Sequence, residues 1–354
     1  MKDIAMTLPT INVAILGFGL SGSTFHAPLI NAIPGYKICK IFARNIDVLQ
    51  QQYPNYSFTS QLDEILNDQQ ISLIINTSPH DRAYSSSKQC LLAGKNVIVE
   101  KPFTVSCAEG HELIQLAQER NLLLSVYHNR RWDNGYLTLQ KTLPQLGKIY
   151  LYEAYFDRFR PLVQKERWKE QPKPGSGLLY DLGSHLIDQA LNLFGMPTTI
   201  SADIAIQRDG AQVPDYFQLT LGYERMRAIL GSSSIIANPR PILAAYGNSG
   251  CYIKHGLDPQ EAQLRSGMTA NHPNYGIEEH EHSGILTTPQ NSPHQQQSII
   301  SESGNYCAYY QQIYAALSAK NAIIPVSAVA ALNVIKIIEL AHTSSHQQKT
   351  ISLT

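Results

Sequence analysis

The sequence predicts an α/β protein with two parts. The first is a doubly wound parallel sheet, and the second is an α+β unit with a largely antiparallel, open sheet. Over the first 130 residues, short apolar runs alternate with segments of helical periodicity, which is typical of a parallel sheet covered by helices on both faces. After Trp132, strand-like segments follow one another with turn residues between them, which is typical of antiparallel sheets. A chain of 354 residues is long enough for two hydrophobic cores, and we expect domains at 1–130 and 131–354.

In the first half, strands and helices are distinguished by the period of their apolar residues. Buried strands are expected at 11–17, 36–43, 72–78, 96–102 and 122–129. A helix is expected after residue 20, with Pro28 near its start or bending it. Further helices are expected at 61–68, 81–95 and 106–121.

The second half begins with a long alternating segment at 147–161, which predicts one extended strand. Residues 270–300 are polar and rich in His, Gln, Asn and Pro, so we expect mainly loop there. Two helices are expected near 304–319 and 326–343. Further strands are expected at 198–207, 215–223, 225–233, 242–247 and 249–256.

The composition favours a small-molecule partner. Lys and Arg together number 28, as do Asp and Glu, so the net charge favours neither nucleic acid nor an anionic membrane as a partner. The sequence shows neither an apolar targeting segment near its start nor a run long enough to span a bilayer. Its five cysteines are scattered and form no CxxC pair, so we expect a reduced, cytoplasmic setting.

Residues 15–28 read ILGFGLSGSTFHAP and place Gly17, Gly19 and Gly22 in the spacing GxGxxG. An apolar strand enters this loop and a helical pattern leaves it, which is the context in which such a loop cradles a dinucleotide. The first glycine permits the turn, the second lets pyrophosphate approach the main chain, and the third lets helix and strand pack closely. Phe18 belongs to the same predicted cofactor site. The alternative is a glycine-rich turn without a ligand.

The end of the second strand indicates which dinucleotide is preferred. NAD-binding domains usually carry Asp or Glu there to bind the ribose hydroxyls. Here Ala43 takes that place and Arg44 follows it. A guanidinium suits a 2′-phosphate, so we expect NADP(H) to be favoured over NAD(H). The alternative is a surface arginine in a loop.

Two further motifs supply groups for acid–base chemistry. Lys101, in the EKP sequence, follows a predicted parallel strand, and ligands of open α/β sheets lie at the carboxyl ends of strands. Asp181 and His185 stand four residues apart in YDLGSHLID, with Asp188 on nearly the same helical face. The alternatives are a solvated lysine, a metal-binding pair without a third ligand, and a capping Asp beside a core His.

Other polar and aromatic residues are weaker candidates. Arg158 and Arg160 share one face of the long predicted strand and could reach a polyol or a cofactor phosphate. For Trp132 and Trp168, core packing is favoured over stacking on a cofactor. The EEHEH stretch at 278–282 resembles a metal-ligand cluster, but its polar, Pro-rich surroundings favour a solvated loop, so we expect no metal site.

Taken together, the glycine loop with HAP, the EKP sequence and the DLGSH sequence resemble the motifs of the glucose–fructose oxidoreductase and inositol dehydrogenase family, Gfo/Idh/MocA. HNRRWD, FDRFRP and KHGLDPQE resemble one subgroup, the NADP-dependent scyllo-inositol dehydrogenases and their bacterial relatives. The resemblance covers nearly the whole chain and implies an N-terminal Rossmann domain followed by an α+β domain. In the family, the open sheet face of the second domain commonly forms the subunit interface, so a homodimer or homotetramer is implied.

Residue by residue, the resemblance implies a catalytic set and a cofactor site. Lys101, Asp181 and His185 match the catalytic set, and all three are expected to touch substrate. Leu182 departs from the hydroxyl residue that some inositol dehydrogenases have there, which leaves the exact polyol open. Besides the glycines and Arg44, the implied cofactor residues are Thr77, Ser78, His80, Glu100 and Lys101.

The expected function is NADP-dependent hydride transfer between nicotinamide and a secondary alcohol or ketone of a cyclic polyol or sugar, with scyllo-inositol and its inosose as the best guess. His185 is expected to act as the general base and Lys101 to stabilise the developing alkoxide, although Lys101 could itself hand over the proton. Asp181 would hold them in place or bind a neighbouring hydroxyl, and Arg158 is expected to help bind the substrate. Two alternatives stay open: a non-catalytic sensor of dinucleotide or sugar, and a dehydrogenase or reductase of a different sugar.

Overall fold

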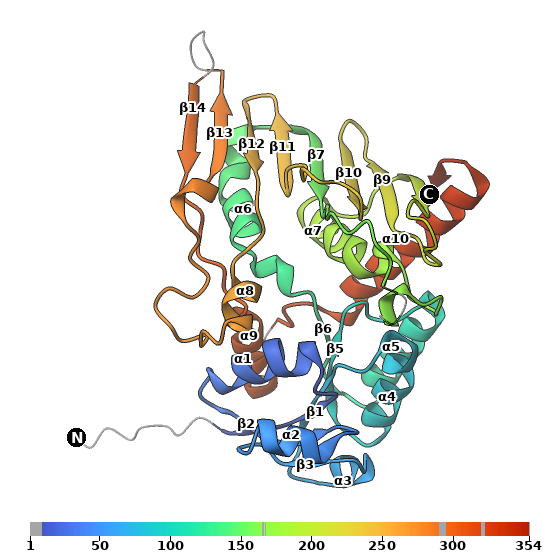
Figure 1. Cartoon of the computed structure of the whole chain (residues 1–354), viewed down its shortest axis with the longest axis vertical. Helices are drawn as coiled ribbons and strands as arrows, with labels where there is room; N and C mark the ends of the chain where they lie inside the picture. Colours follow the sequence, from blue (N-terminus) through green and yellow to red (C-terminus); the bar gives the residue numbers. More distant parts are fainter. Residues whose placement is uncertain (1–8, 165, 167, 290–294, 320–322, 354) are drawn as a thin grey trace.

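The computed structural model describes residues 9–164, 166, 168–289, 295–319 and 323–353, and contains two sheets. In Figure 1 the six-stranded sheet lies in the lower half of the molecule and the nine-stranded sheet in the upper half. One sheet is parallel and the other is mostly antiparallel, which confirms the predicted fold class.

The first sheet is parallel throughout and has the strand order β3-β2-β1-β4-β5-β6. β4 and β6 consist of buried residues only, as expected for strands covered on both faces. The order reverses between β1 and β4, and such a reversal opens a crevice at the carboxyl ends of the strands. The strands are β1 (Ile11–Leu16), β2 (Tyr36–Phe42), β3 (Phe58–Thr59), β4 (Leu73–Asn76), β5 (Asn96–Glu100) and β6 (Leu124–Tyr127).

The helices of this half follow its strands. Pro28 is the second residue of α1, directly after the π-helix η1, so it lies inside a continuous helical segment where the π-helix passes into the α-helix. The Ser106 side chain caps α5 by accepting a hydrogen bond from the Glu109 N–H. The helices are η1 (Ser21–His26), a π-helix that continues into α1 (Ala27–Asn31), then α2 (Ile46–Gln52), α3 (Asp63–Leu66), α4 (His80–Leu92) and α5 (Cys107–Glu119).

The second sheet has the order β14-β13-β12-β11-β7-β10-β9-β8-β15, and among these described strands only β7 and β10 pair in parallel. The helix α6 (Asn134–Leu146) precedes it, after the short η2 (Asn129–Trp132). Its strands are β7 (Ile149–Tyr155), β8 (Thr199–Ala205), β9 (Tyr216–Gly222), β10 (Arg227–Ser233), β11 (Leu243–Gly247), β12 (Gly250–Lys254), β13 (Gly284–Thr288), β14 (Gln295–Ile299) and β15 (Ile351–Ser352).

One face of the second sheet is buried under helices. A row of directly paired residues crosses six strands on this face, and each of them is fully buried. The helices that contact these strands are α6, α7 (Ser184–Phe194) and α10 (Ala328–Gln347). The row consists of Tyr252, Ala245, Tyr152, Ala228, Leu221 and Ile200.

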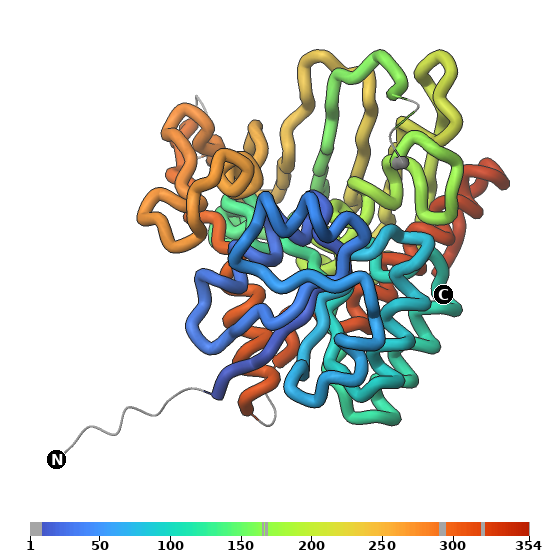
Figure 2. The backbone as a smooth tube through the Cα atoms, turned by 60° about the horizontal axis from the view of Figure 1, so that its bottom comes forward, coloured from blue at the N-terminus to red at the C-terminus, as the bar shows by residue number. Residues whose placement is uncertain are grey.

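The last helices return to the first sheet. α9 (Cys307–Ser318) contacts α1, and α10 contacts both α5 and β6. The Ser125 hydroxyl of β6 donates to the Val326 carbonyl at 2.7 Å and lies 2.8 Å from the Tyr309 hydroxyl. Figure 2 shows these red C-terminal helices against the blue and teal N-terminal half. The two halves are therefore joined by packed helices as well as by the segment after β6.

Two sequence expectations about this half are incomplete. Residues 270–279 form the expected loop, but β13 and β14 form an antiparallel hairpin later in the segment 270–300, at the end of the sheet. The Gln side chains of β14 are exposed, so this strand carries no apolar pattern. The strand predicted at 147–161 ends at Tyr155. Main-chain hydrogen bonds to residues 231–234 continue beyond it, but they form only an isolated bridge between Phe159 and Ile235 and no regular ladder.

Several described elements lie where none was predicted. They include the helices α2, α6, α8 (Gln260–Arg265), η2 and η3 (Trp168–Glu170), and the strands β3 and β15. Among the described helices, none combines the length and apolar character needed to cross a membrane. All five cysteines are unbridged.

Candidate functional site

The glycine loop connects β1 to η1 and lies next to the end of β4. Gly17 has a φ of +97°, and a Cβ there would lie 2.7 Å from the Thr77 Oγ1 atom. A Cβ on Gly22 would lie 2.4 Å from the Gly17 carbonyl oxygen. At Gly19, by contrast, a Cβ would have no described atom within 4 Å. The loop therefore fits a dinucleotide, because two glycines permit its shape and the third leaves its main chain open to a phosphate.

Phe18 lies within this loop and Arg44 follows β2, and their side chains have different environments. The Phe18 side chain packs among Tyr53, Tyr56 and Phe58, with ring centroids 5.1 to 5.6 Å away. A contact between Phe18 and a cofactor would therefore come from its main chain. Arg44 follows β2 and is exposed, so its guanidinium is accessible at the carboxyl end of that strand.

Glu100 ends β5 and ties it to the helix after the glycine loop. Its Oε1 atom accepts hydrogen bonds from the Ser21 hydroxyl and from His26 Nε2 (2.9 Å), and its Oε2 atom accepts one from the Lys101 N–H (3.0 Å). Burial opposes ionisation of this carboxyl, but the bonds from His26 and Ser21 lower its pKa to about 2. His26 Nδ1 also hydrogen-bonds the Tyr310 hydroxyl of α9. Glu100 is thus an anion that links the end of β5 to η1. Its contact with a cofactor stays a prediction.

The structure brings Lys101 and Asp181 together. The Lys101 Nζ atom lies 2.7 Å from the Asp181 main-chain oxygen and 3.2 Å from its Oδ1 atom. Lys169 Nζ lies 2.7 Å from the same Oδ1 atom. Burial opposes the charge of Asp181, but the two ammonium groups hold the pKa of its carboxyl well below the usual range. Burial lowers the pKa of Lys101, and the Asp181 carboxylate opposes that effect.

His185 lies in the first turn of α7, four residues after Asp181, which belongs to the π-helix η4 (Leu179–Gly183). Burial lowers the pKa of its imidazole well below the usual range, and the charges of Lys101 and Arg130 lower it further. The ring is therefore neutral. His128, which follows β6, packs against it with ring centroids 6.4 Å apart. Within the described ranges, both ring nitrogens of His128 and the Nδ1 atom of His185 lack hydrogen-bond partners. Two buried imidazoles are thus available to bind hydroxyls or to accept a proton.

Thr77, Ser78 and His80 follow β4 beside the glycine loop. The Thr77 hydroxyl lies 2.9 Å from a main-chain oxygen at the end of β1, so it joins the two strand ends at the crevice. His80 Nδ1 hydrogen-bonds the Gly175 carbonyl at 3.1 Å. Burial and the charge of Lys101 lower the pKa of His80 to about 4, so this ring is also neutral.

A pocket beside Asp181 is lined by many cationic side chains, among them Arg158, Arg160, Lys169 and Arg208. Arg158 and Arg160 come from the segment after β7. The Arg158 N–H donates to the oxygen of Ser233, the last residue of β10, and the Arg160 N–H donates to that of Ser234; Phe159 between them is exposed. Both arginines line the same pocket, although they lie beyond the end of the strand.

Four residues of this region had no predicted role: Ser21, His26, His128 and Lys169. The rule that singled out Lys101 also marks His128, because His128 follows the parallel strand β6. Ser21 and His26 reach Glu100 only through the fold, and Lys169 lies in a segment without a clear periodic pattern.

Asp188 has a structural partner and does not join Asp181 and His185. Its carboxylate accepts two hydrogen bonds from the Arg131 guanidinium, at 2.8 and 2.7 Å, and is buried. Trp132 is buried in the core, as predicted. The prediction for the Trp168 side chain lies outside the described residues.

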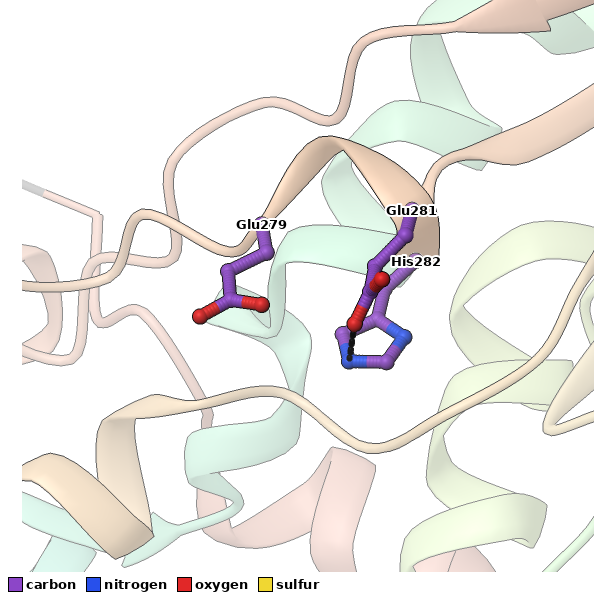
Figure 3. A group of neighbouring side chains, drawn as sticks. All are labelled: Glu279, Glu281 and His282. Carbon is purple, nitrogen blue, oxygen red and sulfur yellow. Dashed lines mark ion pairs between the residues drawn. The ribbon is translucent and has the colours of Figure 1, made fainter.

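The EEHEH stretch lies at η5 (His280–His282) and before it, and Figure 3 shows Glu279, Glu281 and His282 near one another. All three are exposed, and the ion pair between His282 Nε2 and Glu281 Oε1 spans 3.8 Å. Nothing else in the described structure points to a ligand there, so we assign no site to this cluster.

Comparisons with known proteins agree with this fold. Residues 11–128 match the model of an oxidoreductase family described as an NAD-binding Rossmann fold, and residues 143–353 match its C-terminal alpha/beta domain. The chain is 42% identical to scyllo-inositol 2-dehydrogenase (NADP(+)) IolW of Bacillus subtilis, over 97% of this chain and 96% of that protein. It is 39% identical to the oxidoreductase YdgJ of Escherichia coli, over 97% of this chain and 99% of that protein.

Solved structures give the same result. A Bacillus subtilis protein described as an oxidoreductase, yvaA, has a TM-score of 0.94 and 42% identity, with 98% of this chain and 99% of that chain covered. The oxidoreductase YPO2259 of Yersinia pestis has a TM-score of 0.91 and 36% identity, with 98% of each chain covered. The chain therefore belongs to the Gfo/Idh/MocA family of oxidoreductases.

Proposed function

We propose that this protein is an NADP-dependent dehydrogenase that transfers hydride between nicotinamide and a secondary alcohol or ketone of a cyclic polyol or sugar. Scyllo-inositol and its inosose are the first substrates to test. The observation that carries the proposal is the buried contact between Lys101 and Asp181, beside the neutral imidazole of His185. The name of the 42% identical Bacillus subtilis relative supports both the polyol and NADP.

The glycine loop is proposed to hold the pyrophosphate, with the open main chain of Gly19 facing it. The Arg44 guanidinium is proposed to bind the 2′-phosphate, because position 43 offers no carboxylate to bind a ribose hydroxyl. The bound nicotinamide supplies the hydride chemistry, while the protein orients the substrate and moves the proton.

In the oxidation, the substrate hydroxyl loses its proton to a ring nitrogen of His185, which is neutral and has a free lone pair. The Lys101 ammonium donates a hydrogen bond to the same oxygen and stabilises the negative charge that develops on it. Asp181 keeps this ammonium charged and oriented. Because the pKa of His185 lies well below its usual range, the imidazolium passes its proton on readily. In the reduction, protonated His185 returns a proton to the alkoxide oxygen.

The test is the absorbance of reduced nicotinamide, followed with purified protein, NADP or NAD, and a panel of inositols and aldoses. We expect turnover of scyllo-inositol with NADP, and a loss of about 100- to 10,000-fold in kcat for Lys101→Ala and for His185→Ala. Lys141→Ala is the matched control and should leave kcat unchanged, because Lys141 is a largely exposed lysine of α6 and is not among the residues of the proposed site.

Arg44→Ala should raise the KM for NADP and leave the KM for NAD unchanged, since only NADP carries the 2′-phosphate. Turnover that is faster with NAD would contradict the role of Arg44 alone. The absence of turnover with every inositol and sugar would contradict the proposed function. Two expectations about organisation also stay predictions: a domain boundary at residue 130, and a homodimer or homotetramer, which light scattering would identify.

A further inference from the structure

The pocket beside Asp181 carries more positive than negative side chains. Lys101 contacts Asp181 and adds another cation to this region, whereas the neighbouring His80 is neutral. Together with Lys101, the pocket wall has five cationic and three acidic side chains. The charged residues of the pocket wall are Arg158, Arg160, Lys169, Arg208, Glu170, Asp181 and Asp215.

The three acids already have cationic partners. The Arg208 guanidinium binds Asp215 through Nε and Oδ2 at 2.7 Å, and Glu170 through Nη2 and Oε2 at 2.7 Å. Asp181 is shared by two lysine ammonium groups. These pairs neutralise Arg208 and leave no acid of the pocket wall for the other two arginines.

Arg158 and Arg160 are the cations without a matching acid. In the described part of the chain, no carboxylate lies within ion-pair distance of either guanidinium, although sixteen ion pairs occur elsewhere. Main-chain hydrogen bonds to Ser233 and Ser234 fix the backbone of both arginines, so the pair is held side by side. Burial lowers the pKa of Arg158, and the charge of Arg160 lowers it further, which is the effect expected of two like charges.

Such a pair suits an anion better than a neutral polyol. A neutral hydroxyl needs only one hydrogen bond from a neutral or charged donor, and the pocket already offers the hydroxyls of Ser176 and Ser234. Guanidinium groups match the two oxygens of a carboxylate or phosphate in a bidentate geometry, and the negative charge removes the repulsion between them.

We propose that Arg158 and Arg160 form a subsite for an anionic group, a carboxylate or a phosphate, on the sugar or polyol that reacts beside Lys101. This inference rests on the proposed function and narrows its substrate to sugar acids or sugar phosphates. The reacting group and the anionic subsite would share one site, because Asp181 contacts Lys101 and also lines the pocket that holds the two arginines. A neutral inositol would then bind the reacting end of the site and leave the subsite without a ligand.

Calorimetric titration of the NADPH-saturated protein tests this without requiring turnover. The probes are D-glucose, D-glucuronate and D-glucose 6-phosphate, with scyllo-inositol as a second neutral probe. We expect the glucuronate or the phosphate to bind about 10- to 100-fold more tightly than glucose, from one or two charged hydrogen bonds. The member of the pair that binds more tightly identifies the anion as carboxylate or phosphate.

Substitutions of the two arginines distinguish a loss of the anionic subsite from a general loss of folding or ligand binding. Arg158→Gln and Arg160→Gln should each weaken the anionic probe about 10-fold and leave glucose and NADPH unchanged. Arg160 is exposed, so its variant tests the idea even if Arg158→Gln folds poorly. Arg225→Gln is the matched control, because Arg225 is an exposed arginine in the turn between β9 and β10.

Equal binding of neutral and anionic probes would overturn the inference. It would also be overturned if the two arginine variants lost affinity for NADPH and kept their affinity for the anionic probes. Tight anion binding that depends on both arginines, without turnover of any probe by NADP, would support the subsite and contradict the proposed function. Turnover of scyllo-inositol with no preference for anionic probes would support the proposed function and contradict the subsite.

Discussion

Alanine at Gly19 and alanine at Gly22 should have opposite effects, although both glycines belong to one loop. A Cβ at Gly22 would lie 2.4 Å from the Gly17 carbonyl oxygen, whereas ordinary contacts begin near 3.4 Å, so helix and strand must separate by about 1 Å. Overpacking of this kind costs about 1–3 kcal/mol. For a domain of this size, each kcal/mol lowers Tm by roughly 2–4 °C, so we expect Gly22→Ala to lower it by about 2–12 °C.

Gly19→Ala should leave the Tm of the free protein unchanged or slightly higher. A Cβ there meets no described atom, and the alanine reduces the entropy of the unfolded chain. The methyl group would instead occupy the space through which a phosphate approaches the main chain. The loss of one charged hydrogen bond, about 1.5–3 kcal/mol, would weaken binding of the reduced dinucleotide by about 10- to 150-fold.

The assay is a pair of measurements on each variant: thermal unfolding without cofactor, and titration of the fluorescence of reduced nicotinamide. The reasoning is refuted if Gly19→Ala lowers Tm as much as Gly22→Ala, or if Gly19→Ala binds the dinucleotide as tightly as the natural chain. A normal Tm for Gly22→Ala would refute the steric argument at the strand–helix contact.

Two further predictions concern buried charges. The pKa of Glu100 is about 2 against an ordinary 4.5, so its ionisation contributes about 3 kcal/mol of stability, which is present above pH 5 and is lost as the pH falls toward 2. In urea unfolding measured from pH 5 to pH 2, Glu100→Gln should therefore lose less stability than the natural chain. An equal loss in both proteins would exclude Glu100 as its source. Arg131→Met leaves the Asp188 carboxylate buried and unpaired and should cost about 3–5 kcal/mol of stability. Arg265→Met should cost about 1 kcal/mol or less, because Arg265 is exposed and its partner Glu261 also pairs with Arg130. Similar losses of stability in both variants would contradict this difference.

The parallel half of the fold could be predicted because its signals are local. β1, β4 and β6 are short runs of mainly apolar, buried residues, and such runs are recognised from the sequence alone. The meeting of Lys101 with Asp181 was implied by motif resemblance, and the structure places their atoms 3.2 Å apart. Lys169 could not be predicted in this contact, because its position depends on an irregular segment folding over the pocket.

The missed helix α6 shows how buried polar residues hide an amphipathic pattern. Asn134, Thr138 and Thr142 lie at helical spacing on its buried face, where an apolar stripe would ordinarily be expected. The hydroxyls of Thr138 and Thr142 are satisfied by main-chain oxygens four residues earlier, so their burial costs little. β14 is missed for the opposite reason, because its exposed glutamines give no alternation at all.

The helix α10 packs against elements of both halves, which carry the two residues of the proposed catalytic contact. Lys101 follows β5 of the first sheet and Asp181 belongs to η4, and α10 contacts α5 and β6 on one side and η4 and α7 on the other. We expect substitutions that change the packing of α10 to shift these elements relative to each other, and so to affect the contact between Lys101 and Asp181 without touching either group. We therefore expect activity to be sensitive to the size of buried α10 residues such as Ile335 and Ile338.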